Sequence, residues 1–419
     1  MKKVVIIGGG FGGLNAAKLL DYPEIELTVI DRTNHHLFQP LLYQVASSAL
    51  SPGDIATPIR AILKSQKNTT VILGDVSSIS KEKKYIELSD STRYDYDYLV
   101  VATGSRHHYF GQNQWESYAP GLKTIKDALR IRERILLSFE QAETLTHLEH
   151  QKSLMTFVVV GGGPTGVELA GAIKEIASKT MMSNFRNIDP GQARVILVEG
   201  GDRLLMAFPP ALSARAKSFL EGLGVEVRLS AMVTEVSEVG VKLGDVQIET
   251  PNIIWAAGNR TGAVLKTLEL EQDKIGRIFT SPDLSIPGFS NVFIIGDAAH
   301  LKGKDDQPLP GIAPVAIQQG KYVAKLILRE VRGKPRGEKF QYFDKGIMAT
   351  IGKARAVVQT GNLQFSGLFA WLVWIFVHVM YLIGFRNRFV VITEWMWNYI
   401  TGQRAARLIT NPAVKKKAE

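Results

Sequence analysis

Two glycine-rich segments, GGGFGG at residues 8–13 and GGGPTG at residues 161–166, are the parts of this chain with the clearest chemistry. Each follows an apolar run typical of a buried strand, at residues 4–7 and 157–160, and each precedes a helical pattern. A glycine-rich turn between a strand and a helix leaves backbone N–H groups free at the positive end of the helix, where a phosphate binds. The two segments therefore predict two dinucleotide sites on one chain.

The three glycines of the G-x-G-x-x-G pattern have separate roles. The first permits the tight turn, the second lets the backbone approach a pyrophosphate, and the third lets the helix pack closely on the sheet. These positions are Gly8, Gly10 and Gly13 in the first segment and Gly161, Gly163 and Gly166 in the second. A single such pattern also fits an ordinary tight strand–helix turn, so the hypothesis depends on there being two.

An acidic residue follows the next strand of each unit, Asp31 after residues 27–30 and Glu199 after residues 194–198. Carboxylates at this point accept hydrogen bonds from the ribose hydroxyls of adenosine. Glu199 would also repel a 2′-phosphate, which favours NADH over NADPH, although Arg203 nearby weakens that preference. The alternative for either acid is a solvated side chain at a strand end.

Composition limits the remaining functions. A chain of 419 residues, 45% apolar and 21% charged, is long enough for two or three folded domains. The net charge of +10 favours anionic partners, but the basic residues are spread out, so nucleic acid is the weaker interpretation. There are no cysteines, which excludes disulfides, thiolate metal sites and redox-active thiols. We expect no metal, and a flavin as the electron carrier.

The apolar patterns predict an α/β fold with two Rossmann-like dinucleotide-binding domains. The expected strands are residues 4–7, 27–30, 71–73, 98–102, 157–160, 194–198, 253–257 and 292–295, and the expected helices are residues 14–20, 127–148, 167–176 and 314–329. Residues 33–51 lack periodicity and are predicted to form a loop.

The chain resembles the two-dinucleotide-binding flavoproteins and, within them, the type II NADH:quinone oxidoreductases. The resemblance runs nearly end to end and is carried by residues 8–13, 35–46, 100–104, 161–168, 292–298 and 310–320 and by the aromatic C-terminus. It implies an FAD-binding domain at residues 1–118 and 258–332, an NADH-binding domain at residues 119–257, and a C-terminal amphipathic helical membrane-anchoring region at residues 333–419.

The resemblance also implies further cofactor-binding residues. They are Phe11, Gly12, Arg32, Val76, Thr103, Gly104, Gly258, Gly296, Asp297, Ala316 and Ile317. Asp297 would contact the ribityl–phosphate part of FAD, and Val76 would contact the adenine through its backbone. The helix at residues 314–329 would direct its positive end at the flavin. The alternative for Asp297 is a helix N-cap.

The implied reaction passes a hydride from NADH to FAD and then two electrons to a membrane quinone of the respiratory chain, without proton pumping. Glu168 would help to seat NADH or supply protons, although an acid in the first turn of a helix is also common for dipole reasons. Gln318 would donate to a quinone carbonyl. The A-Q-x-x-x-Q run of the family keeps only this second glutamine here, because Pro314 replaces the first.

Tyr43 and Gln44 are the other candidates for the quinone pocket, with core packing as the alternative for Tyr43. Two other functions remain open. A reductase of a protein acceptor, of the ferredoxin-reductase type, has no use for the aromatic C-terminus. A non-catalytic sensor that binds NADH or flavin does not need both glycine segments intact. A sulfide:quinone reductase needs cysteines, which this chain lacks.

The C-terminal aromatic segment predicts attachment to a membrane. Residues 367–385 carry no formal charge and, as a helix, would cover about 28 Å of a bilayer core of about 30 Å. His378 within the segment, and a second aromatic stretch at residues 389–400, favour two helices hinged at residues 386–388 and lying on the membrane. A spanning helix and a buried dimerisation core are the alternatives.

The predicted attachment is peripheral, on the cytoplasmic face of the cell inner membrane, through residues 367–400, with a homodimer possible. Two sets of side chains support it. The interfacial aromatic residues would be Trp371, Trp374, Trp395 and Trp397, and the cations facing anionic lipid would be Arg386, Arg388, Arg404, Arg407 and the lysines at 415–417.

Overall fold

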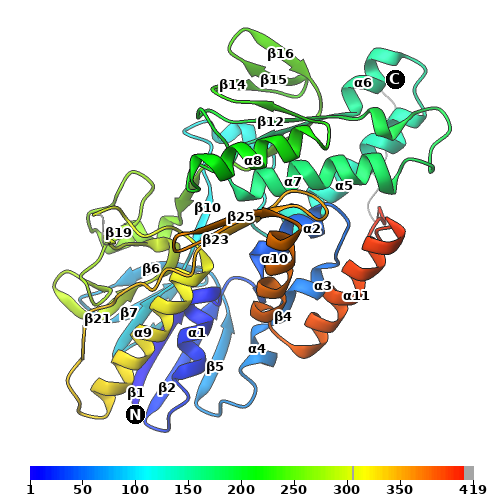
Figure 1. Cartoon of the computed structure of the whole chain (residues 1–419). Helices are drawn as coiled ribbons and strands as arrows, with labels where there is room; N and C mark the ends of the chain where they lie inside the picture. The colour runs from blue at the N-terminus through cyan, green and yellow to red at the C-terminus, as the bar shows by residue number, and fades with distance from the viewer. Residues whose placement is uncertain (304–305, 410–419) are drawn as a thin grey trace. The chain divides into compact units, whose positions relative to one another are not determined.

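The computed structural model describes residues 1–303 and 306–409 (Figure 1). The chain forms two compact units, each made of segments distant in sequence. The first comprises Met1–Leu37, Ala56–Arg106 and Asn259–Lys345, and the second comprises Phe38–Ile55, His107–Gly258 and Gly346–Glu419.

The first unit is built on a six-stranded sheet with the strand order β20-β21-β9-β1-β2-β5. All neighbours pair in parallel except β20, which is antiparallel to β21. The strands are β1 (Lys2–Ile7), β2 (Ile25–Asp31), β5 (Thr69–Leu73), β9 (Tyr98–Val101), β20 (Ser285–Ile286) and β21 (Phe289–Ile294). Because parallel strands end at the same edge of a sheet, the segments after β1, β2 and β9 gather at one edge, where ligands bind in such folds.

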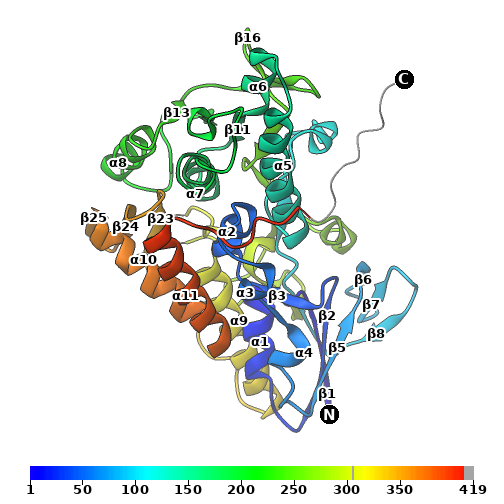
Figure 2. The ribbon, with the colours of Figure 1, turned by 90° about the vertical axis from the view of Figure 1, so that its right-hand side faces the viewer.

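Two helices of this unit, α1 (Phe11–Leu19) and α9 (Ala313–Val331), lie side by side (Figures 1 and 2). A Cβ atom added at Gly320 of α9 would lie 2.2 Å from the carbonyl oxygen of Gly12 in α1, so the two backbones meet with no room for a side chain. The smaller elements of the unit are β3 (His35–Leu37), β4 (Ala56–Pro58), α4 (Ile59–Ile62), β6 (Val76–Ser80), β7 (Tyr85–Leu88), β8 (Arg93–Asp95), η5 (Ala263–Leu268), β19 (Ile278–Phe279), η6 (Gly296–Ala298) and β22 (Ala299–His300).

The second unit repeats the plan with a four-stranded parallel sheet in the order β13-β12-β11-β17. Its strands are β11 (Thr156–Val160), β12 (Arg194–Val198), β13 (Val225–Arg228) and β17 (Asn252–Trp255), and an antiparallel sheet adds β14 (Val233–Val236), β15 (Gly240–Leu243) and β16 (Val246–Glu249). The helices are η2 (Asn113–Ser117), α5 (Ile125–Glu143), α6 (Leu148–Leu154), α7 (Pro164–Glu175), the π-helical turn η3 (Ile176–Thr180), η4 (Pro190–Gln192) and α8 (Pro210–Glu221).

The C-terminal part of this unit is an antiparallel sheet followed by two helices that lie beside each other (Figure 2). The elements are β23 (Ile347–Thr350), β24 (Ala356–Thr360), β25 (Leu363–Gly367), α10 (Leu368–Tyr381) and α11 (Phe385–Thr401). Residues 38–55 also belong to this unit, as η1 (Gln39–Leu41), α2 (Leu42–Ala46) and α3 (Pro52–Ile55). Helix α2 packs against α5 and α7, and α3 packs against α11.

The predicted α/β class with two dinucleotide-binding sheets is confirmed, and three local predictions are wrong. The single helix expected at residues 127–148 is two helices, because Thr144 ends α5 and its hydroxyl donates to the carbonyl of Gln141. The loop expected at residues 33–51 contains β3, η1 and α2, whose short length hides any periodicity.

The hinge between the C-terminal helices also lies earlier than predicted. Helix α10 ends at Tyr381, and Gly384, at φ 89°, turns the chain into α11. Arg388, expected in the hinge, lies in α11 and its guanidinium donates to the carbonyls of Leu382 and Met380, which caps the end of α10. Within residues 1–303 and 306–409, no helix is both long enough and apolar enough to cross a bilayer.

The close contact of α1 and α9 gives a stability prediction. Gly320→Ala places a methyl group against the Gly12 carbonyl and must move the helices apart, so we expect unfolding to become easier by about 1–3 kcal/mol in urea denaturation. Gly53→Ala in α3 is the matched control, because a Cβ there meets nothing within 4 Å. Equal losses in the two variants would contradict the contact.

Candidate functional site

The first glycine segment is held by two close backbone approaches at the edge of the first unit's sheet. Gly8 has φ +103°, and a Cβ there would lie 2.3 Å from the carbonyl oxygen of Ala102, just after β9. A Cβ on Gly13 would lie 1.8 Å from the carbonyl oxygen of Gly8. At Gly10, a Cβ would meet nothing within 4 Å. The loop is therefore packed tightly on the protein side and open on the side where a phosphate would approach.

The second glycine segment repeats this arrangement in the second unit. Gly161 has φ +110°, and a Cβ there would lie 2.7 Å from the backbone nitrogen of Ala257, just after β17. A Cβ on Gly166 would lie 1.9 Å from the Gly161 carbonyl oxygen, and a Cβ on Gly163 would again meet nothing within 4 Å. Because both close contacts and the open position recur, the two segments have the same local structure.

The two predicted acids each fix their own glycine segment. Asp31 accepts the N–H of Gly9 at 2.6 Å with one oxygen, and the N–H of Thr33 at 2.6 Å with the other. Glu199 accepts the N–H of Gly162 at 2.6 Å and that of Gly201 at 2.7 Å. A carboxylate has about four lone-pair positions, so each acid keeps acceptor capacity for a ribose hydroxyl.

The helices that follow the segments keep their first N–H groups available. Helix α1 has Gly10 as its N-cap and α7 has Gly163, and neither N-cap provides a side-chain hydrogen bond. A helix start of this kind leaves N–H groups that a ligand can satisfy, and the helix dipole favours an anion there by about 0.3–1 kcal/mol.

The first unit also offers polar groups for the rest of FAD. The Thr103 hydroxyl is buried and has no hydrogen-bond partner in the part of the chain that the structure describes, which fits a ligand group as the missing partner. Asp297 is not an N-cap. It lies inside η6 and its Oδ2 accepts from the Ser105 hydroxyl at 2.7 Å. The backbone N–H of Gly296, at φ 68°, donates to Gln319 at 2.6 Å. The Thr103 hydroxyl and the remaining acceptor positions of Asp297 fit the polar groups of a dinucleotide.

The other predicted cofactor residues lie on several elements of the two units. Phe11 begins α1 and its ring meets His36 edge-on at 5.1 Å between centroids. Gly104 and Gly258 follow β9 and β17 with φ values of 64° and 69°, which glycine adopts without strain. The remaining positions are Gly12 in α1, the exposed Arg32 after β2, Val76 at the start of β6, and Ala316 and Ile317 in the second turn of α9.

A cavity in the second unit brings together three other predicted residues, Tyr43, Gln44 and Glu168. Its wall comes from α2, α7, the end of β23, α10, α11 and the chain after α11, and includes Trp371, Trp374, Trp395, Tyr399 and Arg404. The surroundings are thus aromatic with a few polar groups, as in sites that bind apolar ring compounds.

Hydrogen bonds orient the polar end of this cavity. The Trp395 indole N–H donates to Gln44 Oε1 at 2.6 Å, and Gln44 Nε2 donates to the Tyr43 hydroxyl oxygen at 3.0 Å. Since an indole can only donate, the Gln44 amide has one orientation, and the Tyr43 hydroxyl keeps its own proton to donate. Burial raises the pKa of Tyr43 well above its usual value, so that proton is present at neutral pH.

Glu168 is the acid of the cavity. Helix α7 begins at Pro164, three residues earlier than predicted, so Glu168 lies beyond the first turn and the dipole explanation for an acid there does not hold. Its Oε1 accepts the N–H of Thr350 at the long distance of 3.4 Å, and the side chain is buried. Burial raises the pKa of Glu168 to about 8.

Gln318 belongs to the first unit, apart from the unit that holds the cavity. Its amide pairs with the backbone of Phe343, donating to the carbonyl at 2.9 Å and accepting the N–H at 3.0 Å. One amide N–H remains for another acceptor.

Several residues of these sites were missed or misplaced by sequence reasoning. Trp374, predicted at the membrane interface, is 2% exposed, and Arg404, predicted to face lipid, is 6% exposed and lines the cavity. A tryptophan or an arginine can lie either at a membrane surface or in a buried cavity, so only the folded structure shows which position each residue takes. Ser105, Gln319 and Glu175 carry no signal in the sequence. The lysines at 415–417 lie outside the described residues.

Comparison with known proteins places this geometry in context. The family model for pyridine nucleotide-disulphide oxidoreductases matches residues 2–320, and the model for the NDH2 C-terminal domain matches residues 345–404. The type II NADH:quinone oxidoreductase Ndh of Mycobacterium tuberculosis is 44% identical over 98% of this chain and 90% of its own length. A type II NADH:quinone oxidoreductase of Staphylococcus haemolyticus is 32% identical over 84% of this chain and 88% of its own.

Solved structures agree on the fold. NDH2 from Plasmodium falciparum in complex with NADH has a TM-score of 0.88 at 22% identity, covering 96% of this chain and 99% of that one. The sulfide:quinone oxidoreductase of Aquifex aeolicus has a TM-score of 0.75 at 16% identity, with 95% of each chain covered.

The raised pKa of Glu168 predicts a pH-dependent stability difference. The folded protein holds this proton more tightly than the unfolded chain, so ionising Glu168 lowers the free energy of unfolding as pH rises from about 4.5 to about 8. Glu168→Gln removes that loss, and the variant should gain stability relative to the parent between about pH 5 and about pH 8.5. Urea denaturation at both pH values measures it. A difference that does not change with pH would contradict the assignment.

Proposed function

The chain belongs to the type II NADH:quinone oxidoreductase family, and we propose that it oxidises NADH through bound FAD and reduces a membrane quinone without pumping protons. The observation that carries this proposal is the repetition of one glycine-segment geometry in two units, because two dinucleotides on one chain suit a flavin and a nicotinamide. The aromatic cavity supports a quinone as the final acceptor, because it has both apolar rings and oriented polar groups. A protein acceptor has no need of such a cavity.

We assign FAD to residues 1–118 and 258–332 and NADH to residues 119–257, with membrane association at residues 333–419. When bound, FAD supplies a carrier that accepts two electrons from NADH and gives them to the quinone. The N–H groups at the start of α1 would hold its pyrophosphate. Asp31, Thr103 and Asp297 would hold its other polar groups. In the second unit, the start of α7 would hold the NADH pyrophosphate, and Glu199 would accept from the ribose hydroxyls and disfavour a 2′-phosphate.

For the quinone we propose the cavity of the second unit. The Tyr43 hydroxyl can donate a hydrogen bond to a quinone carbonyl, and the hydrogen bonds from Trp395 to Gln44 and from Gln44 to Tyr43 hold this hydroxyl in place. Reduction of a quinone to a quinol takes up two protons. Glu168, which holds a proton near neutral pH, can supply one of them and regain it from solvent. Gln318 belongs to the first unit and is not part of this cavity; we keep it as a separate candidate donor to a quinone carbonyl through its remaining N–H.

The proposed function is tested by acceptor choice. The purified protein in detergent should oxidise NADH quickly with a short-chain quinone, slowly with NADPH as donor, and not with an oxidised ferredoxin. Rapid reduction of the ferredoxin without quinone reduction would instead support the reductase of a protein acceptor. Binding of NADH without any turnover would support a sensor.

The oriented hydrogen bonds of the cavity predict a specific kinetic defect. Trp395→Phe removes the indole N–H that fixes Gln44, so the Tyr43 hydroxyl loses its support, and the KM for the quinone should rise about fivefold to tenfold, as expected for about 1–1.4 kcal/mol. The KM for NADH should not change. Trp397→Phe, which alters an exposed indole on the same helix, is the control. A change in the KM for NADH alone would contradict the role of this cavity.

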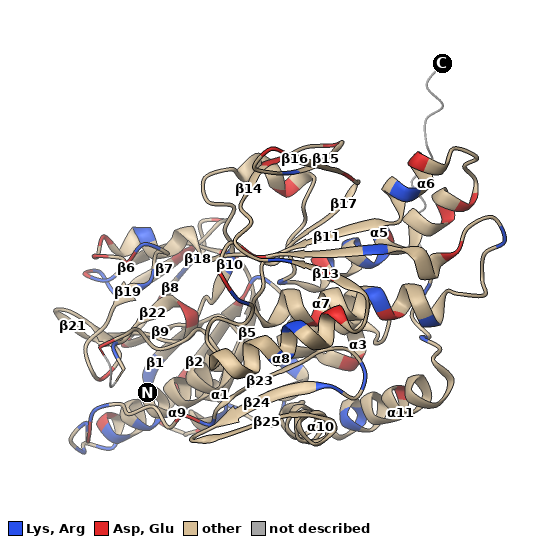
Figure 3. Cartoon of the chain, turned by 45° about the horizontal axis from the view of Figure 1, so that its top comes forward, with Lys and Arg blue, Asp and Glu red and all other residues tan. Residues whose placement is uncertain are grey.

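The membrane proposal rests on two exposed apolar stripes. Helix α10 carries no Lys, Arg, Asp or Glu (Figure 3), and most of the exposed large apolar residues of the two helices follow one another at intervals of three or four positions. They are Leu368, Phe369, Leu372, Phe376, Met380 and Tyr381 on α10, and Phe385, Phe389, Ile392, Met396, Trp397, Tyr399 and Ile400 on α11. Unpaired apolar faces of this extent bind a bilayer interface or another protein.

We propose that these stripes lie on the cytoplasmic face of the inner membrane. A quinone dissolves in lipid whereas NADH dissolves in water, so an enzyme that uses both has a reason to lie on the surface. The exposed Arg386 beside the stripes suits anionic headgroups, worth about 1 kcal/mol per cation. Alternatively, a second copy of the chain could cover these faces in a homodimer formed through residues 367–400.

Charge placed on the stripes should weaken binding to lipid. The double variant Phe376→Glu with Phe389→Glu should pellet less with vesicles of anionic lipid, by about tenfold or more, since each charge opposes insertion by about 2 kcal/mol or more. Val239→Glu, which alters an exposed residue between β14 and β15, should not affect pelleting. Unchanged pelleting of the double variant, together with a shift from dimer to monomer in sedimentation, would favour the homodimer.

A further inference from the structure

Helix α7 carries two acids on the same face, Glu168 and Glu175, and both line the cavity. Seven residues separate them, which is close to two helical turns and about 10.5 Å along the axis. Their surroundings are opposite. Among residues 1–303 and 306–409, Glu168 has only the long hydrogen bond from the Thr350 N–H, whereas both oxygens of Glu175 have donors close to them.

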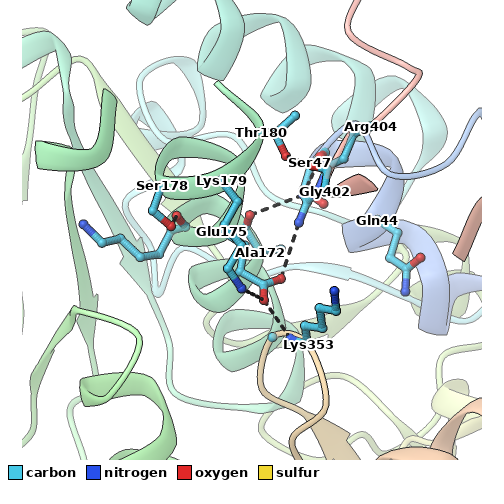
Figure 4. A network of polar contacts seen from close by, with 12 residues as sticks. Gln44, Ser47, Ala172, Glu175, Ser178, Lys179, Thr180, Lys353, Gly402 and Arg404 are labelled. Atoms are coloured by element: carbon cyan, nitrogen blue, oxygen red, sulfur yellow. Dashed lines mark hydrogen bonds and ion pairs between the residues drawn. The ribbon is translucent and has the colours of Figure 1, made fainter. Parts of the chain in front are cut away.

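Glu175 pairs with two cations, the exposed Lys179 and the buried Arg404 from the chain after α11. The Arg404 guanidinium lies 3.5 Å from Glu175 Oε2, with side-chain exposures of 5% and 12% (Figure 4). The same guanidinium donates to the carbonyl of Ser47, at the end of α2, at 2.7 Å and to that of Ala172 at 3.3 Å. Glu175 Oε1 accepts the backbone N–H of Lys353 at 2.8 Å. A buried arginine with this many bonds is held in one place.

The pairing has an electrostatic consequence for the other acid. A buried carboxylate without a cation destabilises charge on a second carboxylate nearby, because both share a poorly solvated region. Arg404 cancels the charge of Glu175, so Glu168 ionises and takes up a proton with little influence from it.

We propose that the Arg404–Glu175 ion pair has a positioning role: it neutralises the charge of Glu175, so that Glu168 remains the carboxyl of the cavity that holds and releases a proton. This inference rests on the proposed role of Glu168 in supplying protons. It assigns to the C-terminal segment a task inside the cavity, separate from membrane attachment.

The other charged and titratable groups that face Glu168 are few. From α2 comes Tyr43, whose pKa is raised so that it is neutral. From the π-helical turn η3 comes Lys179, whose side chain is 49% exposed and whose Nζ lies 3.3 Å from Glu175 Oε1. From the turn after β23 comes Lys353, and from α10 comes His378, stacked on the cavity residue Trp374, with a pKa lowered by burial to about 4. Among these described groups, Lys179 and Lys353 are the cations besides Arg404, and Lys179 is screened by solvent.

The inference predicts opposite effects for the two partners. Arg404→Gln leaves Glu175 negative, so the titration midpoint of Glu168 should rise by roughly one pH unit, for a charge about 10 Å away at an effective dielectric constant of about 20. Glu175→Gln leaves the Arg404 charge uncompensated, so the midpoint should fall by a similar amount. The double variant restores neutrality and should return close to the parent.

The test titrates Glu168 directly. Infrared difference spectra of the purified FAD-loaded protein, recorded across pH without NADH or quinone, show the protonated carboxyl, and Glu168→Gln identifies its band. Arg407→Gln is the matched control, because it removes a cation from the same segment that contacts the Thr180 carbonyl rather than Glu175, and its midpoint should not move. If Arg404→Gln does not bind FAD, Glu175→Gln carries the test, since the bonds of Arg404 to Ser47 and Ala172 remain.

Opposite shifts that cancel in the double variant support the inference, because a purely structural role of Arg404 would not give opposite signs. No shift, or shifts of the same sign in both variants, overturns it. The pH profile of quinone reduction is measured alongside. If the midpoint of the band moves as predicted while this profile does not follow, the ion pair stands and the proposed proton role of Glu168 fails.

Discussion

One hydrogen-bond arrangement underlies both proposed nucleotide sites of this protein. In each unit the carboxylate that ends the second strand accepts the N–H of the glycine at the middle of the G-x-G, from Gly9 to Asp31 and from Gly162 to Glu199, at 2.6 Å in both. The bond fixes a segment that its glycines would otherwise leave mobile. It also directs the remaining N–H groups outward, where a phosphate can accept them. Because two units use the same bond, the account of two dinucleotides depends on it.

In the cavity of the second unit, buried charges are likewise compensated by hydrogen bonds or ion pairs. Two acids, one arginine and one tyrosine lie where water is largely excluded, and an uncompensated charge there would be costly. The protein pairs Glu175 with Arg404 and leaves Glu168 and Tyr43 able to stay neutral. The groups that would handle protons are thereby separated from the groups that hold the C-terminal segment in place.

The sequence predicted the fold and both glycine segments because these depend on local rules. Gly8, Gly13 and their counterparts are needed for backbone contact, and strand-end acids such as Asp31 follow directly from the strand pattern. The cavity could be predicted only in part. The family resemblance predicts Tyr43, Gln44 and Glu168. Arg404, however, comes from a segment more than 200 residues beyond Glu168. Trp374 is buried, but the sequence around it would look the same if it faced lipid. The positions of such residues depend on packing between segments distant in sequence, which a local sequence pattern does not predict.

The most direct test of the whole account follows the visible absorbance of the purified protein in an anaerobic stopped-flow instrument. Mixing with NADH should remove the yellow colour within the turnover time, and mixing the reduced protein with a short-chain quinone should restore it at a comparable rate. A colourless preparation that does not take up FAD, or colour that NADH removes and quinone does not return, would contradict the account.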